Sequence, residues 1–274
     1  MFNRTGLILL TLLLASGSVY AKSKKKDKPP VKPRFDDPSI PFRMAPMPSA
    51  SRSIAVSLLP ELHLAFDTEN CRTHTAWSGK GLHLLGPQYS LSKRPFISTN
   101  DAPVLWTMPP WSPWSAVKPI NKAEPLKAHY RAVSSKGEHS TFIYDLIITG
   151  DEEIRIRETP RGVLLSEGAA IVRHIEIGPA EHELWFAAHC GFGKVSKQPN
   201  GFRLGKLTAA LRMPQTASIR LTSYDANFDE EVFTEEGAEK GNPIVHREGR
   251  LATAWIHIPA RNHAVTIEIA TITS

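Results

Sequence analysis

The chain has 274 residues, of which 41% are hydrophobic and 22% are charged, and its formal net charge is +6. Residues 22–52 hold nine basic and three acidic residues, a net charge of +6, whereas residues 53–274 hold 23 basic and 24 acidic residues, a net charge of −1. A nucleic-acid-binding domain carries a basic face or stripe. The neutrality of residues 53–274 therefore argues against a nucleic acid as the partner.

The first 21 residues predict a secretory signal peptide. Arg4 supplies a positive start, Leu7–Leu14 is apolar except for Thr11, and Val19-Tyr20-Ala21 has the small-x-small pattern of a cleavage site. A bilayer span needs about 20 apolar residues, so a run of about ten is too short for a permanent anchor. We therefore expect a periplasmic or secreted protein without a transmembrane segment after cleavage.

Residues 22–52 have the composition of a basic, proline-rich linker. Lys22–Lys28 is a run of charge, and the segment holds seven of the 22 prolines. Proline stiffens a chain toward polyproline II and like charges repel one another, so we expect no packed core here. Two interpretations stay open: a solvated spacer, or a cationic arm that adheres to an anionic envelope or polymer.

Residues 53–274 are long enough for one sizeable core and show no internal repeat, so we expect a single domain. Their dominant periodicity is two, as in Ile154-Arg155-Ile156-Arg157, and it recurs over 171–176, 254–258 and 265–270. Such alternation places one set of side chains on the buried face of a sheet. The other expected strands are 53–59, 62–67, 72–77, 81–85, 128–134, 140–149, 183–189, 202–205, 207–213 and 217–224.

Turn residues separate these strands, and no segment holds a 3.6-residue periodicity over three turns. Gly191-Phe192-Gly193 is interpreted as one such turn, and the acidic stretch 229–241 as a short helix or a mobile loop. Many short strands with regular turn signals indicate an all-β fold. We predict an antiparallel β-sandwich of two packed sheets, with a supersandwich or jelly roll as variants.

A cluster of tryptophans between prolines is the first candidate for a binding surface. Trp106, Trp111 and Trp114 lie in a segment with four prolines, which restrict the backbone. Flat indole rings can stack on sugar rings, and their N–H groups can donate to a ligand. The alternative is that this segment is an ordered loop that closes one end of the core.

Asp67-Thr68-Glu69, followed at a distance by Trp77, is the second candidate. In an extended strand Asp67 and Glu69 would share a face, as a carboxylate pair for acid–base chemistry does. At the end of a strand the same residues form an ordinary Asx turn. Both interpretations stay open.

The cysteines and histidines complete the candidates. Cys71 and Cys190 can form a disulfide outside the cytoplasm, or they stay as buried thiols. The eleven histidines show no metal-ligand spacing, and no phosphate-binding, dinucleotide-binding or haem-attachment motif is present. We therefore expect no metal and no cofactor, and the catalytic residues, if there are any, stay unknown.

One part of the chain resembles a known family. Ala65-Phe66-Asp67-Thr68-Glu69, continued by Arg72 and Ala76-Trp77-Ser78-Gly79, resembles the signature AFDTxxLRxxxAWxGG. This signature opens an uncharacterised extracytoplasmic domain at the N-terminal end of large secreted haem-binding, sugar-dehydrogenase-like proteins of planctomycete and verrucomicrobial bacteria. Later elements of that domain are matched, over residues 53–190, by Pro110-Trp111-Ser112, Tyr130-Arg131-Ala132, Phe142–Glu158 and Ile171–Ile175.

The chain also departs from that family. Cys71, Lys80 and Ala132 stand where the pattern has a leucine and two glycines, and the sequence holds no propeller or cytochrome module. The resemblance therefore implies a stand-alone copy of an extracytoplasmic domain. It transfers neither an electron-transfer role nor catalytic residues.

These observations favour a binding or accessory module for a carbohydrate or an envelope protein. The predicted ligand contacts are Trp77, Trp106, Trp111, Trp114 and Asp67. The alternative is a carbohydrate-active enzyme of the epimerase, lyase or hydrolase type, with a histidine and a Glu or Asp on a concave sheet face. A purely structural envelope component is the third hypothesis.

Overall fold

The computed structural model describes residues 41–44, 52–79, 83–84, 97–98, 104–120, 124–148, 152–231 and 244–273. The chain divides into two units. Met1–Pro33, with the predicted signal peptide and the lysine run, lies outside the described residues, and every feature below belongs to Arg34–Ser274. Nowhere in the described ranges does a helix long and apolar enough to cross a membrane occur.

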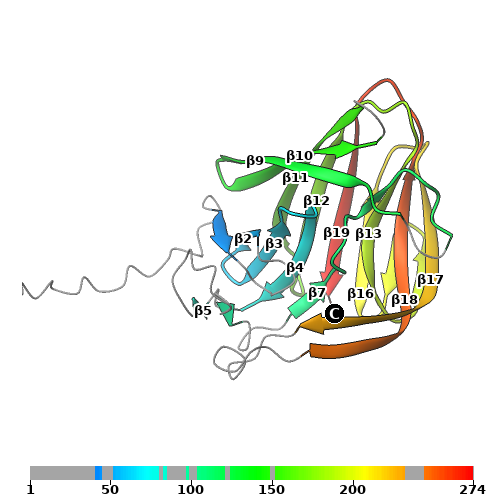
Figure 1. Cartoon of the computed structure of the whole chain (residues 1–274). Coiled ribbons are helices and arrows are strands. Elements are labelled where there is room, and N and C mark those ends of the chain that lie inside the picture. The colour runs from blue at the N-terminus through cyan, green and yellow to red at the C-terminus, as the bar shows by residue number, and fades with distance from the viewer. Residues whose placement is uncertain are drawn as a thin grey trace, which may run out of the picture. The chain divides into compact units, whose positions relative to one another are not determined.

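The described residues form antiparallel strands and no helix, which confirms the all-β prediction (Figure 1). The N-terminal sheet has the order β1 (Phe42–Met44), β2 (Ser53–Leu59), β3 (Leu62–Asp67), β4 (Arg72–Ser78), β7 (Val104–Thr107). The large sheet has the order β14 (Val195–Gln198), β15 (Gly201–Leu204), β16 (Leu207–Arg212), β19 (Val265–Thr273), β12 (Ala169–Ile177), β11 (Glu153–Leu164), β10 (His139–Ile147), β9 (Lys127–Lys136). The ribbon sheet has the order β17 (Ser218–Glu231), β18 (Ile244–Ile258), β13 (Leu184–Phe192), β8 (Trp114–Ser115), and β5 (His83–Leu84) pairs with β6 (Ile97–Ser98).

The alternation in the sequence explains why these strands have one buried face. In β11, Ile154 and Ile156 are buried whereas Arg155 and Arg157 are exposed. The same alternation continues in β19, where Ile267 and Ile269 are fully buried. Successive side chains of a strand point to opposite faces of the sheet, so an alternating sequence buries its apolar set against a second layer.

One core joins the three larger sheets. Phe66 of β3 stacks on Phe142 of β10, with ring centroids 4.3 Å apart, which packs the N-terminal sheet on the large sheet. The guanidinium of Arg173 in β12 lies 5.3 Å from the ring centroid of Phe186 in β13, which packs the ribbon sheet on the large sheet. The large sheet is thus one layer of the sandwich, and the other two sheets supply the opposing layer.

Strands β17 and β18 of the ribbon sheet are longer than predicted. β13 pairs with β18 only over Leu251–Ile258, whereas β17 pairs with β18 along its whole length. Asp225–Glu231 and Ile244–Arg250 therefore continue beyond β13 as a two-stranded ribbon, which Figure 1 shows running below the end of β13. The expected helix or loop at 229–241 is wrong for Asp229–Glu231, which are strand, and its other residues lie outside the described ranges.

Candidate functional site

The predicted tryptophan surface is largely part of the core. Trp77 and Trp114 are fully buried and Trp106 is 8% exposed, so the prediction that they contact a ligand is wrong. Nε1 of Trp114 donates to the hydroxyl of Tyr144 over 3.1 Å. Of the predicted tryptophan contacts only Trp111 is half-buried, because this segment folds onto the core with its other two indole rings pointing inward.

The Asp67 carboxylate is a buried turn residue rather than a ligand contact. Oδ1 accepts a hydrogen bond from the backbone N–H of Glu69 over 2.9 Å, which is an Asx turn. Oδ2 accepts from Nδ2 of Asn70 and from Nε of Arg72, and the Asp67 and Arg72 side chains are each 1% exposed. Glu69 is exposed, so the predicted carboxylate pair does not share one site.

A second buried ion pair links all three larger sheets. Oε1 of Glu158 in β11 accepts from Nε of Arg173 over 2.6 Å and from Oγ1 of Thr73 in β4 over 2.6 Å. Nη1 of Arg173 donates to the carbonyl oxygen of Ala188 in β13 over 3.2 Å. The Arg173 and Glu158 side chains are 2% and 1% exposed. We call Arg173 and Glu158 the interior ion pair, which holds the layers together and has no surface for a ligand.

A neutral histidine lies beside the interior ion pair. Nε2 of His189 is 2.8 Å from Oγ1 of Thr271, and the His189 ring packs edge-on against Trp106 with centroids 5.1 Å apart. Burial, with a further contribution from the charge of Arg173, lowers the pKa of His189 to about 3. This imidazole therefore stays neutral and structural near neutral pH.

Cys71 and Cys190 are buried free thiols, so of the two open interpretations the disulfide is wrong. Cys71 lies between β3 and β4 of the N-terminal sheet, whereas Cys190 lies in β13, and Sγ of Cys190 accepts from Oγ1 of Thr253 over 3.0 Å. Burial raises the pKa of each thiol to about 12. Within the described residues, no three His, Cys, Asp or Glu side chains are placed to hold a metal ion.

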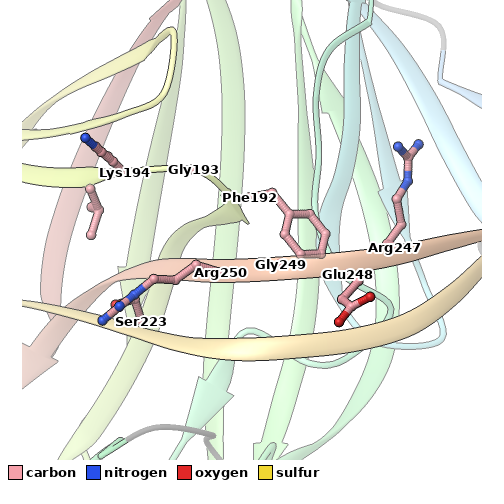
Figure 2. A pocket seen from close by; sticks show the side chains of 9 residues that line it. Phe192, Gly193, Lys194, Ser223, Arg247, Glu248, Gly249 and Arg250 are labelled. Atoms are coloured by element: carbon pink, nitrogen blue, oxygen red, sulfur yellow. The ribbon is translucent and has the colours of Figure 1, made fainter.

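An open cavity lies where the ribbon passes the end of β13 (Figure 2). This hollow, which we call the Phe192 hollow, has a volume of about 760 Å³. Phe192 ends β13 and is 39% exposed. Gly249 of β18 lies against it, and a Cβ there would be in ordinary contact with the ring at 3.5 Å. Glycine is favoured at this position because its φ is +146°.

Three aromatic rings form a row along the ribbon. Phe192 stacks on Phe228 of β17, with centroids 5.5 Å apart and ring planes inclined by 24°. Phe228 in turn packs edge-on against Trp111, with centroids 6.3 Å apart. We call Trp111, Phe228 and Phe192 the aromatic row. Phe228 is half-buried between the two outer rings and fixes their separation.

Basic side chains border the exposed ring. Lys194, Arg247 and Arg250 line the Phe192 hollow together with a single carboxylate, Glu248. In Figure 2 the ring of Phe192 lies between Arg247 on one side and Lys194 and Arg250 on the other. Nε of Arg250 donates to Oγ of Ser223 over 2.9 Å, which orients its guanidinium. Basic groups thus outnumber acidic groups at this hollow, although residues 53–274 as a whole are almost neutral.

Phe192 was not predicted as a site residue, because Gly191-Phe192-Gly193 has the pattern of a turn. An aromatic residue between two glycines is a weak signal, since neither neighbour has a side chain that could cover the ring. The sequence showed no sign of a basic cluster, because Lys194 is far along the chain from Arg247 and Arg250. They meet only where the β17–β18 ribbon passes the turn after β13.

The comparisons with known proteins give no family. No family model matches the chain, and no curated protein does. The resemblance to the extracytoplasmic domain therefore stays a prediction. Among solved structures, a heparinase III gene product is similar over 85% of this chain and 36% of its own chain, with a TM-score of 0.44 and 8% identity. Its form with methylated lysines gives a TM-score of 0.39. This chain spans little more than a third of the heparinase chain, and we draw no conclusion about chemistry from so small a similarity.

Proposed function

We propose that this chain is an extracytoplasmic module that binds an anionic carbohydrate at the Phe192 hollow. The single observation that carries the proposal is the exposed ring of Phe192 between basic side chains in an open cavity of about 760 Å³. The signal-peptide pattern of the first 21 residues supports a periplasmic or secreted location.

The chemistry of the hollow suits an acidic sugar. The apolar C–H face of a pyranose ring packs on an aromatic ring, which then loses its contact with water. A carboxylate or sulfate on the same sugar accepts charge-assisted hydrogen bonds from guanidinium and ammonium groups, and the planar Arg guanidinium can pair with two oxygens of such an anion in a bidentate manner. Phe192 would supply the stacking surface, and Lys194, Arg247 and Arg250 would supply the charges.

A carbohydrate-cleaving enzyme is the second candidate, and one observation favours it. Nδ1 of His246 lies 2.9 Å from Oδ1 of Asp229 on the ribbon, and Asp229 lines a cavity that adjoins the Phe192 hollow. The His246 and Asp229 side chains are 54% and 68% exposed, however. General acid–base groups usually work in a shielded site that tunes their protonation, so binding without cleavage is the favoured function.

Affinity gel electrophoresis of the mature chain tests the proposal. The gels contain polygalacturonate or alginate as anionic polymers, or dextran as a neutral polymer, and the variants are Phe192→Ala and Leu164→Ala. Leu164 is the matched control because it is an exposed apolar residue of β11, 75% exposed and outside the hollow. We expect an anionic polymer to retard the wild type and Leu164→Ala, with retardation that weakens as salt is added. We expect Phe192→Ala to migrate freely.

Three results would overturn or change this assignment. Retention of the wild type by none of the anionic polymers, or equal retention of Phe192→Ala, would refute an anionic-carbohydrate site at this hollow. A pull-down in which an envelope protein is captured by the wild type and lost in Phe192→Ala would assign the hollow to a protein instead. Shortening of the polymer during incubation, abolished by Asp229→Asn, would favour the enzyme.

A further inference from the structure

We infer that the binding site is an elongated groove for several successive sugar units of one chain, with a second stacking position at Trp111. This inference rests on the proposed function and specifies its substrate class, namely the interior of an extended anionic polysaccharide rather than a single sugar or a chain end. It goes beyond the Phe192 hollow because its other end is lined by the turn between β3 and β4, the Trp111 segment and the start of β9.

The first step is that a second cavity adjoins the Phe192 hollow. A space of about 250 Å³ shares Phe192 and Arg247 with the first hollow, and its wall also contains Phe228 and Pro110. A ligand that stacks on Phe192 can therefore extend past Phe228 without leaving the surface of the ribbon.

The second step is that the groove reaches the third ring of the aromatic row. A space of about 330 Å³ shares Pro110 with the second cavity and is lined by Trp111, Asn70, Lys127 and His129. Trp111 is the most exposed of the six tryptophans, because the other five are at most 8% exposed. Its indole ring lies beside polar side chains that can pair with sugar hydroxyl groups.

The third step is that the charges differ along the groove. The Phe192 end has three basic groups and one carboxylate, and the adjoining cavity adds Asp229, which is paired with His246. The Trp111 end has Lys127 opposed by Glu69, together with His129. Anionic groups of the ligand are therefore held at the Phe192 end, whereas the Trp111 end adds stacking and hydroxyl contacts. This division predicts that Trp111 contributes only when the ligand is long enough to reach it.

A chain-length series tests the inference with oligogalacturonates and alginate oligomers, from disaccharide to octasaccharide, titrated into the mature chain by calorimetry. We expect the affinity to rise at least tenfold from the disaccharide to the hexasaccharide and then to level off. Trp111→Ala should remove this gain while the disaccharide affinity stays within twofold of the wild type. Trp111→Phe, which keeps an aromatic ring against Phe228, should retain most of the gain. Phe192→Ala should weaken the binding of every length.

Tryptophan fluorescence supplies a second measurement in the wild-type chain. Since the other five tryptophans are buried, acrylamide quenches mainly Trp111. We expect the hexasaccharide to protect this fluorescence from quenching and the disaccharide to leave it unchanged.

The outcomes separate this inference from the proposed function. An affinity that does not depend on chain length, a hexasaccharide that does not protect Trp111, or a Trp111→Ala variant with the full gain would overturn the elongated groove and leave the Phe192 site intact. Loss of disaccharide binding in both Trp111 variants would also overturn it, because Trp111 would then belong to the first position. Absence of binding by any oligomer or polymer to the wild type would refute the proposed function itself.

Discussion

The interior ion pair and the Phe192 hollow use the same side-chain types for opposite purposes. In the interior, Arg173 lies over the ring of Phe186 and is paired with Glu158, and both charged side chains are almost completely buried. At the hollow, Phe192 is 39% exposed and basic groups outnumber carboxylates. The two regions differ in burial and in the ratio of basic to acidic groups rather than in the types of side chain.

This comparison teaches what makes a basic–aromatic cluster structural or available for a ligand. A buried charge is tolerated when an opposite charge is present beside it within the protein. The interior ion pair is closed off from solvent, so a ligand cannot reach it, although Oε2 of Glu158 has no hydrogen-bond partner. An exposed ring beside excess charge leaves apolar surface and electrostatic potential that a partner can use. Four experiments test this comparison, in order of expected effect. Three test whether buried groups are structural, and one tests whether the Phe192 hollow is available for a ligand.

The largest effect is expected from breaking the interior ion pair. Arg173→Ala leaves the buried carboxylate of Glu158 without its cation, and such a loss costs about 3–5 kcal/mol of unfolding free energy. Urea unfolding measures this loss of unfolding free energy. The matched control is Arg161→Ala, because Arg161 is 46% exposed and pairs with Glu268 at the surface. Surface pairs contribute about 0–1 kcal/mol. Similar losses in the two variants would contradict the structural role of the interior pair.

The next effect is a loss of stability in acid. The pKa of His189 is lowered to about 3 by burial, whereas in the unfolded chain it is ordinary, so the unfolded chain binds more protons below about pH 6.5. The unfolding free energy is therefore fully present above that pH and falls toward pH 3, by about 1.4 kcal/mol per pH unit for this histidine.

Urea unfolding at pH 7 and pH 5 measures this slope. His189→Gln should show a shallower loss between the two values than the wild type, because one titrating group has been removed. His263→Gln, at an exposed position, should keep the wild-type slope. Equal slopes in the wild type and His189→Gln would contradict the buried, neutral state of His189.

A smaller effect is expected at the hollow, and on binding rather than on stability. Lys194→Gln removes one exposed cation. The unfolding free energy should stay within about 0.5 kcal/mol of the wild type. The affinity for the retained anionic polymer should fall severalfold at low salt and converge with the wild type at high salt, because exposed charges are screened. Calorimetry measures the affinity of both proteins for the polymer at low and at high salt. A difference in affinity that does not change with salt would argue against an electrostatic role for Lys194.

The smallest effect is expected from reducing agents. Since Cys71 and Cys190 are buried thiols whose pKa values are raised to about 12, neither should react with a thiol reagent in the folded chain, and both should react in guanidinium. Dithiothreitol should leave the unfolding temperature unchanged. A lowered temperature, or fewer than two reactive thiols in guanidinium, would show that a disulfide exists.

Much of the fold could be predicted from the sequence because side-chain alternation is local information. The expected strands at 53–59 and 62–67 coincide with β2 and β3, since turn residues end each strand next to it in the chain. The ribbon was predicted too short. Asp225–Glu231 has only two apolar residues, Ala226 and Phe228, which is too short an alternation to predict a strand, and its pairing with β18 makes it one.

The sequence predicted the types of residue expected in a sugar site, but most of the residues that it named are buried. Asp67 and Trp77 have the residue types of a sugar site, but residue type does not say whether a side chain faces the core. Only Trp111 of the predicted contacts lies along the groove, and Phe192, Arg247 and Arg250 were not anticipated. Their contact depends on pairings between segments that are far apart in the chain.

The sequence by itself determined the all-β class, the positions of most strands and the neutrality of residues 53–274, because alternation, turns and charge are properties of neighbouring residues. Only the tertiary structure decided that Trp77 and Trp114 face inward, that Cys71 and Cys190 stay apart, and that Phe192 meets the basic side chains of the ribbon. The physical reason is that burial and contact between distant segments are set by how the sheets pack, which no local pattern specifies.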